Sequence, residues 1–441
     1  MKKITVLLLT LCLVMGLCSC TIRLSTTDIP KGNDAPPQVD PAADPVEDEE
    51  LTLEAEMALK STVELLSADV EGLGYIAPAL DKNSGLWGYI NLKSEWVISP
   101  KFRSAEPFSG DYACVRDAYG DHVFVDKSGE DIFAWNKAAM SLAAVSSFSE
   151  GLANATIDSG YTQQMCYLDT AGNYAVPLTS LPRASGVNYR TVKYVELATP
   201  FRNGKAVVMR YTNATLAAEG IGASDTAYVI DTAGNVIASL ASGLDASIYG
   251  FDDNMRIVVK ATNGLYGLAD ENGNMVAHAA YLRILHCEGG LYLACDQSGF
   301  WGVIDKDGNT IVEPMYNNAL PYSEGYAAVS DGIHWGFIDE AGNIVIPIQY
   351  DDVAALKKAV NGNAESSGAF GSGVAVVRAG KYWGVIDKSG NILYAAEAQE
   401  CPVSCISNGF MTFEYSEGCG VISTDGKLAI IPIYDGIGEF K

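Results

Sequence analysis

The sequence predicts an all-β fold made of tandem antiparallel β repeats. Two observations predict it: a short pattern of β-prone and turn residues recurs about nine times, and its copies lie 34 to 36 residues apart wherever no insertion intervenes. Three or four short strands per repeat exclude a helical solenoid. The first strand of each copy ends at an Asp, Asn or Ser, namely Asn91, Asp126, Asp169, Asp231, Asp270, Asp305, Asp339, Asp387 and Ser423.

Residues 1–19 have the features of a lipoprotein signal peptide. Two lysines form a basic start, and the apolar stretch over residues 4–17 is too short for a stable membrane span. Leu17-Cys18-Ser19-Cys20 follows and resembles the lipobox of bacterial lipoproteins, in which the Cys after two small residues is acylated. The resemblance implies lipid attachment at Cys20 and a location at the cell membrane, on its exported side. An ordinary signal peptide with incidental cysteines, or a membrane helix, is the alternative.

Residues 20–50 form an acidic, Pro-rich tether in this interpretation. Five prolines oppose helix formation, and the run Glu47-Asp48-Glu49-Glu50 adds like charges that repel one another. Residues 51–70 contain a predicted helix over residues 51–66, with apolar residues at mixed helical spacing. We expect this helix to cap or pack on the body, although it could also bind a partner. Residues 71–441 form the repeat domain.

The clearest repeat runs from Gly299 to Pro314. Five β-prone residues from Trp301 predict a strand, and Asp305-Lys306-Asp307-Gly308-Asn309 predicts a hairpin in which Asp bonds the turn backbone and Gly takes a positive φ. A second strand follows, and its Pro is predicted to mark the strand's end or an edge position. Ser323-Glu324-Gly325 then turns the chain into a return strand over residues 326–329.

A Trp-Gly pair opens the first strand of four repeats. These pairs are Trp87-Gly88, Trp301-Gly302, Trp335-Gly336 and Trp383-Gly384. The pattern resembles the WG-repeat family of bacterial proteins, and the resemblance covers nearly all of residues 71–441. The family consists largely of uncharacterised interaction proteins, so the resemblance implies a binding scaffold and no mechanism. Other copies keep the Asp and Gly turn but lack the Trp.

Two roles are open for these tryptophans. A Trp repeated on the surface could stack on sugar rings, whereas a Trp wedged between sheets would be a packing residue. We expect packing, because the Gly that follows each Trp allows another backbone to approach closely. The Trp-Gly pairs are therefore interpreted as the structural motif of the repeat.

The chain ends distinguish a closed, propeller-like ring from an open β-hairpin array. Residues 71–80 look like a return strand without a first half, and residues 434–440 look like a first half without a return strand. Together they would complete one unit, which is how many propellers remove their sheet edges. Nine units exceed the usual four to eight blades, and an open array can also begin mid-repeat. The matching ends favour the ring.

Two insertions interrupt the repeats. Residues 135–145 and 350–360 are predicted as short helices, and a Gly- and Ser-rich segment over residues 361–373 follows the second. Loops on the rim of a rigid scaffold are where binding usually resides.

Residues with catalytic or metal-binding potential do not form a convincing site in the sequence. Asp305-Lys306-Asp307-Gly308-Asn309 has alternate carboxylates as in a calcium loop but lacks the distal acidic ligand. Cys401 and Cys405 have C-x-x-x-C spacing, and the chain has only four histidines, none beside a nucleophile motif. The sequence predicts no catalytic residue, no metal and no cofactor. Carboxylates converging in the ring's centre remain an alternative that spacing alone does not place.

Charge limits the kinds of partner. Lys and Arg number 29 against 54 Asp and Glu, which gives a formal net charge of −25 and opposes binding to nucleic acid. The leading hypothesis is a non-enzymatic, surface-anchored lipoprotein that presents a β-repeat scaffold for protein or ligand binding. A module that binds cell-wall or other glycans is the second hypothesis, and a glycan-processing propeller enzyme is the third.

Overall fold

The computed structural model describes most of the chain after residue 51. The described residues are 52–60, 68–132, 141–146, 148–158, 163–176, 195–211, 227–241, 243–247, 250–360, 363–366, 368–415 and 418–441. The predicted signal peptide, Cys20 and the tether lie outside them. Helix α2 (Leu53–Lys60) lies within the predicted helical segment. In the described part of the chain, no helix is long and apolar enough to cross a membrane.

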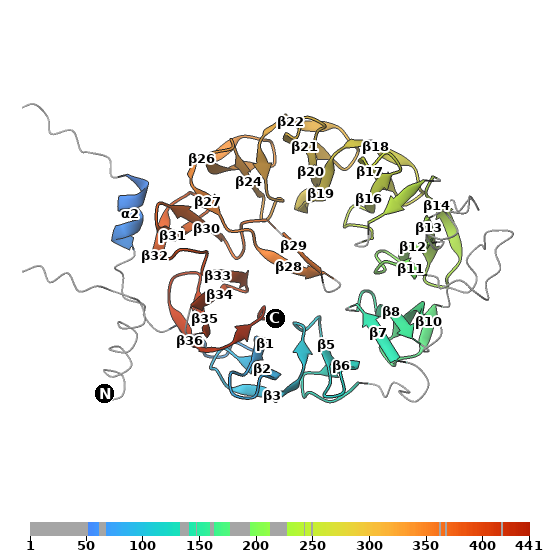
Figure 1. The fold of residues 1–441 in the computed structure, drawn as a ribbon, viewed down its shortest axis with the longest axis horizontal. Helices are drawn as coiled ribbons and strands as arrows, with labels where there is room; N and C mark the ends of the chain where they lie inside the picture. Colours follow the sequence, from blue (N-terminus) through green and yellow to red (C-terminus); the bar gives the residue numbers. More distant parts are fainter. Residues whose placement is uncertain are drawn as a thin grey trace, which may run out of the picture. The chain divides into compact units, whose positions relative to one another are not determined.

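Nine small antiparallel sheets form a nine-bladed β-propeller (Figure 1). Blades 1 to 9 follow the chain, and within each blade the strands are numbered from the ring's centre outward, except that β37 is the innermost strand of blade 1. The all-β prediction, the count of nine and the closed ring are thereby confirmed. The open array is excluded.

The strands of the nine blades are short. Blade 1 contains β1 (Ile76–Leu80), β2 (Trp87–Asn91), β3 (Trp96–Phe102) and β37 (Gly436–Ile437). Blade 2 contains β4 (Ser104–Ala105), β5 (Tyr112–Arg116) and β6 (His122–Asp126). Blade 3 contains β7 (Ser141–Val145), β8 (Leu152–Asp158), β9 (Gln163–Asp169) and β10 (Tyr174–Val176). Blade 4 contains β11 (Val195–Ala198), β12 (Lys205–Tyr211), β13 (Ala227–Asp231) and β14 (Val236–Ser239). Blade 5 contains β15 (Leu244–Ala246), β16 (Arg256–Ala261), β17 (Tyr266–Asp270) and β18 (Met275–Tyr281). Blade 6 contains β19 (Arg283–His286), the 3-10 turn η2 (Glu288–Gly290), β20 (Leu291–Cys295), β21 (Trp301–Asp305) and β22 (Thr310–Tyr316). Blade 7 contains β23 (Asn318–Ala319), β24 (Tyr326–Ser330), β25 (Trp335–Asp339) and β26 (Ile344–Tyr350). Blade 8 contains β27 (Asp352–Val353), β30 (Val374–Ala379), β31 (Tyr382–Asp387) and β32 (Ile392–Glu397). Blade 9 contains β33 (Val403–Ser407), β34 (Phe410–Tyr415), β35 (Gly418–Ser423) and β36 (Leu428–Tyr434).

The sequence repeat and the blade are out of phase. The Trp-Gly strand is the third strand of its blade, and the strand after the Asp turn is the fourth and outermost. The return strand belongs to the next blade: after β22 of blade 6, the chain enters blade 7 through β23 and returns in β24. Each sequence repeat therefore links two neighbouring blades.

The two chain ends close the ring in blade 1. Strand β37 pairs antiparallel with β1, with Ala79 opposite Ile437 and Leu80 opposite Gly436. The backbone of Lys441 extends this pairing, because its N–H and C=O each bond Ile76 at 3.0 Å. The predicted union of the two half-units is confirmed.

The prediction that Pro ends the second strand of the repeat is wrong. The prolines lie inside the outermost strands, and β22 continues past Pro314 to Tyr316, which pairs with Trp301. The outer edge of such a strand needs no N–H for the ladder, so Pro is tolerated there and blocks the pairing of further strands. The alternative edge position is what the fold uses.

The turn after each third strand is held by its Asp. In blade 7 the Asp339 Oδ1 accepts bonds from the N–H groups of Ala341 at 3.0 Å and Asn343 at 2.8 Å, and its Oδ2 accepts one from the Asn343 side chain at 3.0 Å. Hydrogen bonds from the Asn343 side chain and backbone lower the pKa of Asp339. Gly342 takes φ 84°. This is the hairpin chemistry that the sequence predicts.

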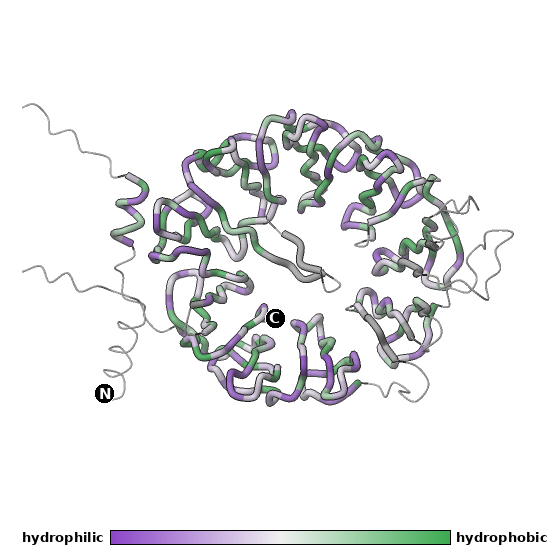
Figure 2. The backbone as a smooth tube through the Cα atoms, viewed as in Figure 1, coloured by the Kyte–Doolittle hydropathy of each residue, from purple (hydrophilic) through white to green (hydrophobic). Residues whose placement is uncertain are grey.

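The hydrophobic core lies largely in the seams between blades. One cluster joins Leu293, Trp301 and Val312 of blade 6 to Val329 and Ile338 of blade 7. Figure 2 shows hydrophobic stretches along the strands of these blades. Neighbouring blades therefore stabilise one another by burial.

The two predicted insertion helices are wrong where the structure describes them. Residues 141–145 form β7, and residues 350–360 contain the end of β26, β27 and β28 (Lys357–Val360). Strand β28 pairs with β29 (Asn363–Ser366) in a hairpin that projects toward the ring's centre in Figure 1. Both segments contain Ala and Val at a spacing that also suits strands, and sheet pairing decides the outcome.

Candidate functional site

The four Trp-Gly pairs all lie in the blade seams. Trp301 and Trp383 are each 7% exposed and belong to buried clusters, whereas Trp87 and Trp335 are half-buried and pack against the clusters of their blades. The Trp side chains therefore contribute to packing, with two of them partly open to solvent.

The Gly of three pairs is covered by the outer strand of its own blade. A Cβ built on Gly302 would lie 2.5 Å from the Val312 carbonyl oxygen, and the outer-strand backbone is equally close to Gly88. At Gly336 the nearest backbone atoms lie at 2.7 Å. The fourth pair differs, because Gly384 faces the side chain of Met57 from α2.

Polar contacts tie the turns of successive blades together on one face of the ring. The Glu150 carboxylate accepts bonds from the Asn203 N–H at 2.6 Å and the Gly204 N–H at 2.9 Å. Glu324 accepts one from the Gly373 N–H at 2.9 Å, and the Lys388 Nζ bonds the Glu324 carbonyl at 2.9 Å. These contacts join the turns of neighbouring blades.

One histidine lies beside a buried carboxylate at the seam of blades 5 and 6. The Asp252 Oδ1 accepts bonds from the N–H groups of Asn254 at 2.8 Å and Arg256 at 3.0 Å, and the Tyr292 hydroxyl donates to its Oδ2. Burial, and then the charge of Asp252, raise the pKa of Tyr292. The His286 Nε2 lies 3.7 Å from the Asp252 Oδ2, beyond hydrogen-bond range. Asp252 therefore ties a loop of blade 5 to blade 6 through Tyr292.

A second pairing, of Cys114 with His122, is unsuited to nucleophilic chemistry. The Cys114 Sγ lies 3.6 Å from the His122 Nδ1. Burial raises the pKa of Cys114 to about 12, and burial followed by the charge of Arg116 lowers the pKa of His122. Both groups are neutral near pH 7, so no thiolate is available to attack a substrate.

The Asp305 turn considered as a calcium loop uses its carboxylate within the hairpin. Its Oδ1 accepts from the N–H groups of Asp307 and Asn309 at 2.8 Å each, and its Oδ2 accepts from the Asn309 side chain at 2.8 Å. Asp307 instead pairs with Arg256 of blade 5 at 3.1 Å. In the part of the chain with assigned positions, no group of three His, Cys, Asp or Glu side chains could hold a metal ion. All seven described cysteines, including Cys401 and Cys405, are free thiols.

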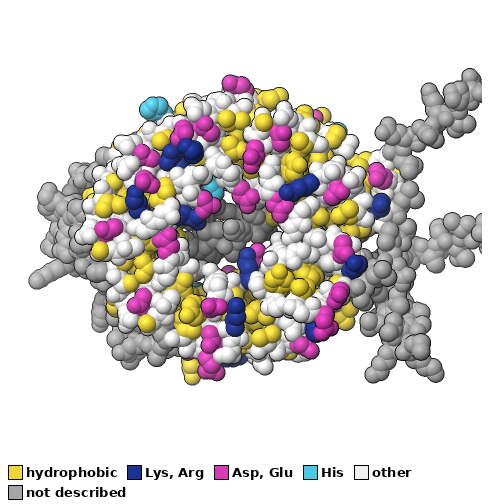
Figure 3. All heavy atoms as spheres, turned by 180° about the vertical axis from the view of Figure 1, so that it is seen from behind, with side chains coloured by type: hydrophobic (Ala, Val, Ile, Leu, Met, Phe, Trp, Pro, Cys, Tyr) yellow, Lys and Arg dark blue, Asp and Glu magenta, His cyan; other side chains and the backbone are white. Residues whose placement is uncertain are grey.

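Exposed aromatic residues are dispersed over the described surface. Tyr119 of blade 2 is 84% exposed, Tyr174 of blade 3 is 52% exposed, and Phe300 of blade 6 is 39% exposed. Figure 3 shows hydrophobic side chains in separate patches and charged side chains around the central opening. The three most exposed aromatic side chains therefore lie on three different blades.

Part of the repeat region matches a known protein family. The family model of the WG containing repeat matches residues 87–117, 301–332 and 335–358. These segments are similar to the WG containing repeat. The WG repeats so matched include the Trp-Gly pairs of blades 1, 6 and 7, whereas Trp383-Gly384 of blade 8 lies outside them.

Other comparisons add little to the WG-repeat assignment. No curated protein matches the chain. The computationally designed Ika8 protein is 14% identical over 74% of this chain and 95% of that one, with a TM-score of 0.39. The computationally designed Ika4 protein is 16% identical over 40% of this chain and 98% of that one, with a TM-score of 0.23. Neither similarity carries an argument about function.

Two contacts of the structure were not predicted from the sequence. The contact of Met57 with Gly384 had no distinct signal, because the outer strand of blade 5 lacks Pro as that of blade 8 does and still covers Gly267. The tie between Asp252 and Tyr292 had none, because the two residues lie 40 positions apart and neither belongs to the repeat pattern.

Proposed function

We propose that this chain is a non-enzymatic lipoprotein that presents the WG-repeat propeller as a scaffold for binding a protein or another ligand. Acyl chains on Cys20 would hold it at the cell membrane on the exported side, with each buried methylene contributing about 0.8 kcal/mol. The acidic tether of residues 20–50 would separate the ring from the bilayer.

One observation supports the scaffold role above the others: the recurring chemical groups of the repeat are used inside the ring. The turn carboxylates bond their own hairpins, as at Asp305 and Asp339, and the Trp side chains pack in seams. What a partner can reach is the surface of the loops and of the outermost strands. A rigid ring with variable loops is a common basis for binding.

The glycan-binding and glycan-processing hypotheses receive no comparable support. The three exposed aromatic residues lie on separate blades. The variants of the Trp-Gly pairs described in the Discussion test the glycan-binding hypothesis directly.

The lipid anchor is tested by replacing Cys20. We expect Cys20→Ser to abolish incorporation of labelled fatty acid and to leave the protein unprocessed or released from the membrane fraction, because only the thiol at this position forms the thioether. Cys18→Ser is the matched control, since it keeps a small residue two positions earlier, and it should retain labelling. Continued labelling of the Cys20→Ser protein would overturn the proposed anchor.

A further inference from the structure

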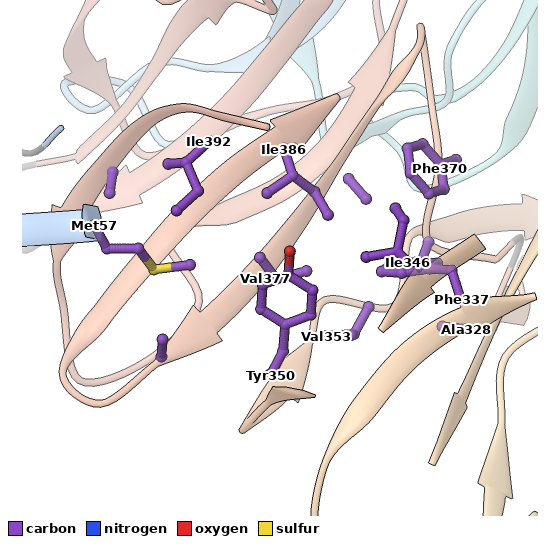
Figure 4. Close-up of a cluster of buried hydrophobic side chains, with 14 residues drawn as sticks. Met57, Ala328, Phe337, Ile346, Tyr350, Val353, Phe370, Val377, Ile386 and Ile392 are labelled. Atoms are coloured by element: carbon purple, nitrogen blue, oxygen red, sulfur yellow. The ribbon is translucent and has the colours of Figure 1, made fainter. Parts of the chain in front are cut away.

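Helix α2 packs on blade 8 with one fully buried side chain. Met57 is completely buried, in a cluster with Ile386 and Ile392 (Figure 4). Leu53 packs partly against the same cluster, and the carboxylate of the otherwise exposed Glu54 lies against Gly380 of blade 8. Among the described side chains of α2, Met57 is the one that is fully buried.

The seat for Met57 is a notch above Gly384. A Cβ built there would lie 2.9 Å from the Met57 Cε and 3.2 Å from its Sδ. At the five corresponding glycines, the nearest atom to such a Cβ is a backbone atom of the blade's own outer strand, at 2.5 to 2.7 Å; these are Gly88, Gly267, Gly302, Gly336 and Gly420. In these five blades the backbone of the outer strand covers the Gly, whereas in blade 8 the Met57 side chain of α2 covers Gly384.

The strand pairing of blade 8 explains why its notch is open. In blade 6 the register shifts between Trp301 and Val303, so the outer strand bulges over the intervening Gly. In blade 8 Trp383 pairs with Ala396 and Gly384 pairs with Ala395 without a shift. The outer strand β32 therefore runs straight past Gly384, and α2 packs mainly on this strand.

The chain after α2 has a second attachment on blade 9. The Ala68 N–H bonds the Leu428 carbonyl of β36 at 2.7 Å, and Val70 packs against the cluster shared by blades 9 and 1. Residues 53–67 lie between the tether and this second attachment. Release of α2 alone would leave the ring closed.

We infer that α2 is a releasable latch, seated in the Gly384 notch, which sets how far the tether lets the propeller reach. This inference rests on the proposed anchor for its consequence, although not for the latch itself. Docked α2 holds the chain to the propeller from Leu53 onward, and after its release the next described attachment is at Ala68. An eight-residue helix is not stable alone, so the released residues of α2 would add up to about 26 Å to the tether.

Hydrogen exchange of the full-length protein tests the latch. We expect the α2 amides to exchange faster than those of β30 and β31, because a weakly attached element opens locally. Met57→Ala and Gly384→Ala should each accelerate exchange in α2 by about tenfold or more and leave exchange in the blade cores unchanged. The two changes together should do no more than either alone, since both remove the same contact.

Gly302→Ala is the matched control at the position that blade 6 closes with its own strand. It should accelerate exchange in blade 6 and leave α2 unchanged. Exchange of α2 at the rate of β30 and β31 in every variant would overturn the latch, and so would a Met57→Ala protein with unaltered α2 exchange. Because this readout does not depend on acylation, its failure is distinguishable from failure of the Cys20→Ser test.

Discussion

Deletion of residues 435–441 should destabilise the whole propeller rather than fray one end. The deletion removes β37 and the buried side chains of Ile437 and Phe440, which are 8% and 1% exposed. Each such side chain contributes roughly 1.5–3 kcal/mol by burial, so we expect a loss of about 3–6 kcal/mol in the free energy of unfolding. That is a large part of the total stability of an ordinary domain. The exposed edge of β1 should also promote aggregation.

Point variants near the seam separate loss of packing from the effect of shortening the chain. Phe440→Ala alone should cost about 3–5 kcal/mol. Ile433→Ala, at a nearby side chain that is 47% exposed, should cost well under 1 kcal/mol. Chemical unfolding measures both. If the deletion left the unfolding transition unchanged, ring closure would not be a source of stability.

Replacing the buried tryptophans should have the second largest effect. Trp301→Ala and Trp383→Ala each remove a side chain that is 7% exposed and leave a cavity in a blade seam, at about 3–5 kcal/mol. Trp87→Ala and Trp335→Ala should cost about half as much, because these side chains are half-buried. Thermal unfolding of the four variants measures the order of these losses in stability.

The same four variants separate packing from glycan binding. If the Trp side chains are packing residues, retention on polysaccharide, measured well below the unfolding transition, should not depend on them. Unchanged melting curves together with lost polysaccharide retention would contradict the packing role and would promote the glycan-binding hypothesis. The close outer strand at Gly302 favours the packing outcome, since a solvent-facing platform would not need that approach.

Much of the architecture follows from local residue patterns. Asp339 and Gly342 specify a hairpin through hydrogen bonds and a positive φ that neighbours in sequence supply. Such a turn needs no distant contact, and its recurrence therefore predicts the number of blades. The half-units at the two chain ends predict closure for the same reason, because each end shows which strand it lacks.

The features that were missed depend on contacts between distant segments. Whether the Pro314 strand ends or continues is decided by the pairing of Tyr316 with Trp301 across a bulge. The docking of Met57 depends on a strand more than 300 residues later, so no local pattern in the sequence indicates it. The candidate site was even harder to predict from the sequence. Hydrogen bonds such as that between Tyr292 and Asp252 join blades through residues outside the repeat pattern.

Amide hydrogen exchange of the C-terminal segment tests the closed ring most directly. In the structure the Gly438 N–H bonds the Pro78 carbonyl at 2.8 Å, and the Lys441 N–H bonds the Ile76 carbonyl at 3.0 Å. The closed ring predicts that these amides are protected like those within the blades, despite their place at the end of the chain. Exchange of residues 436–441 at the rate of an unstructured peptide would contradict closure by β37.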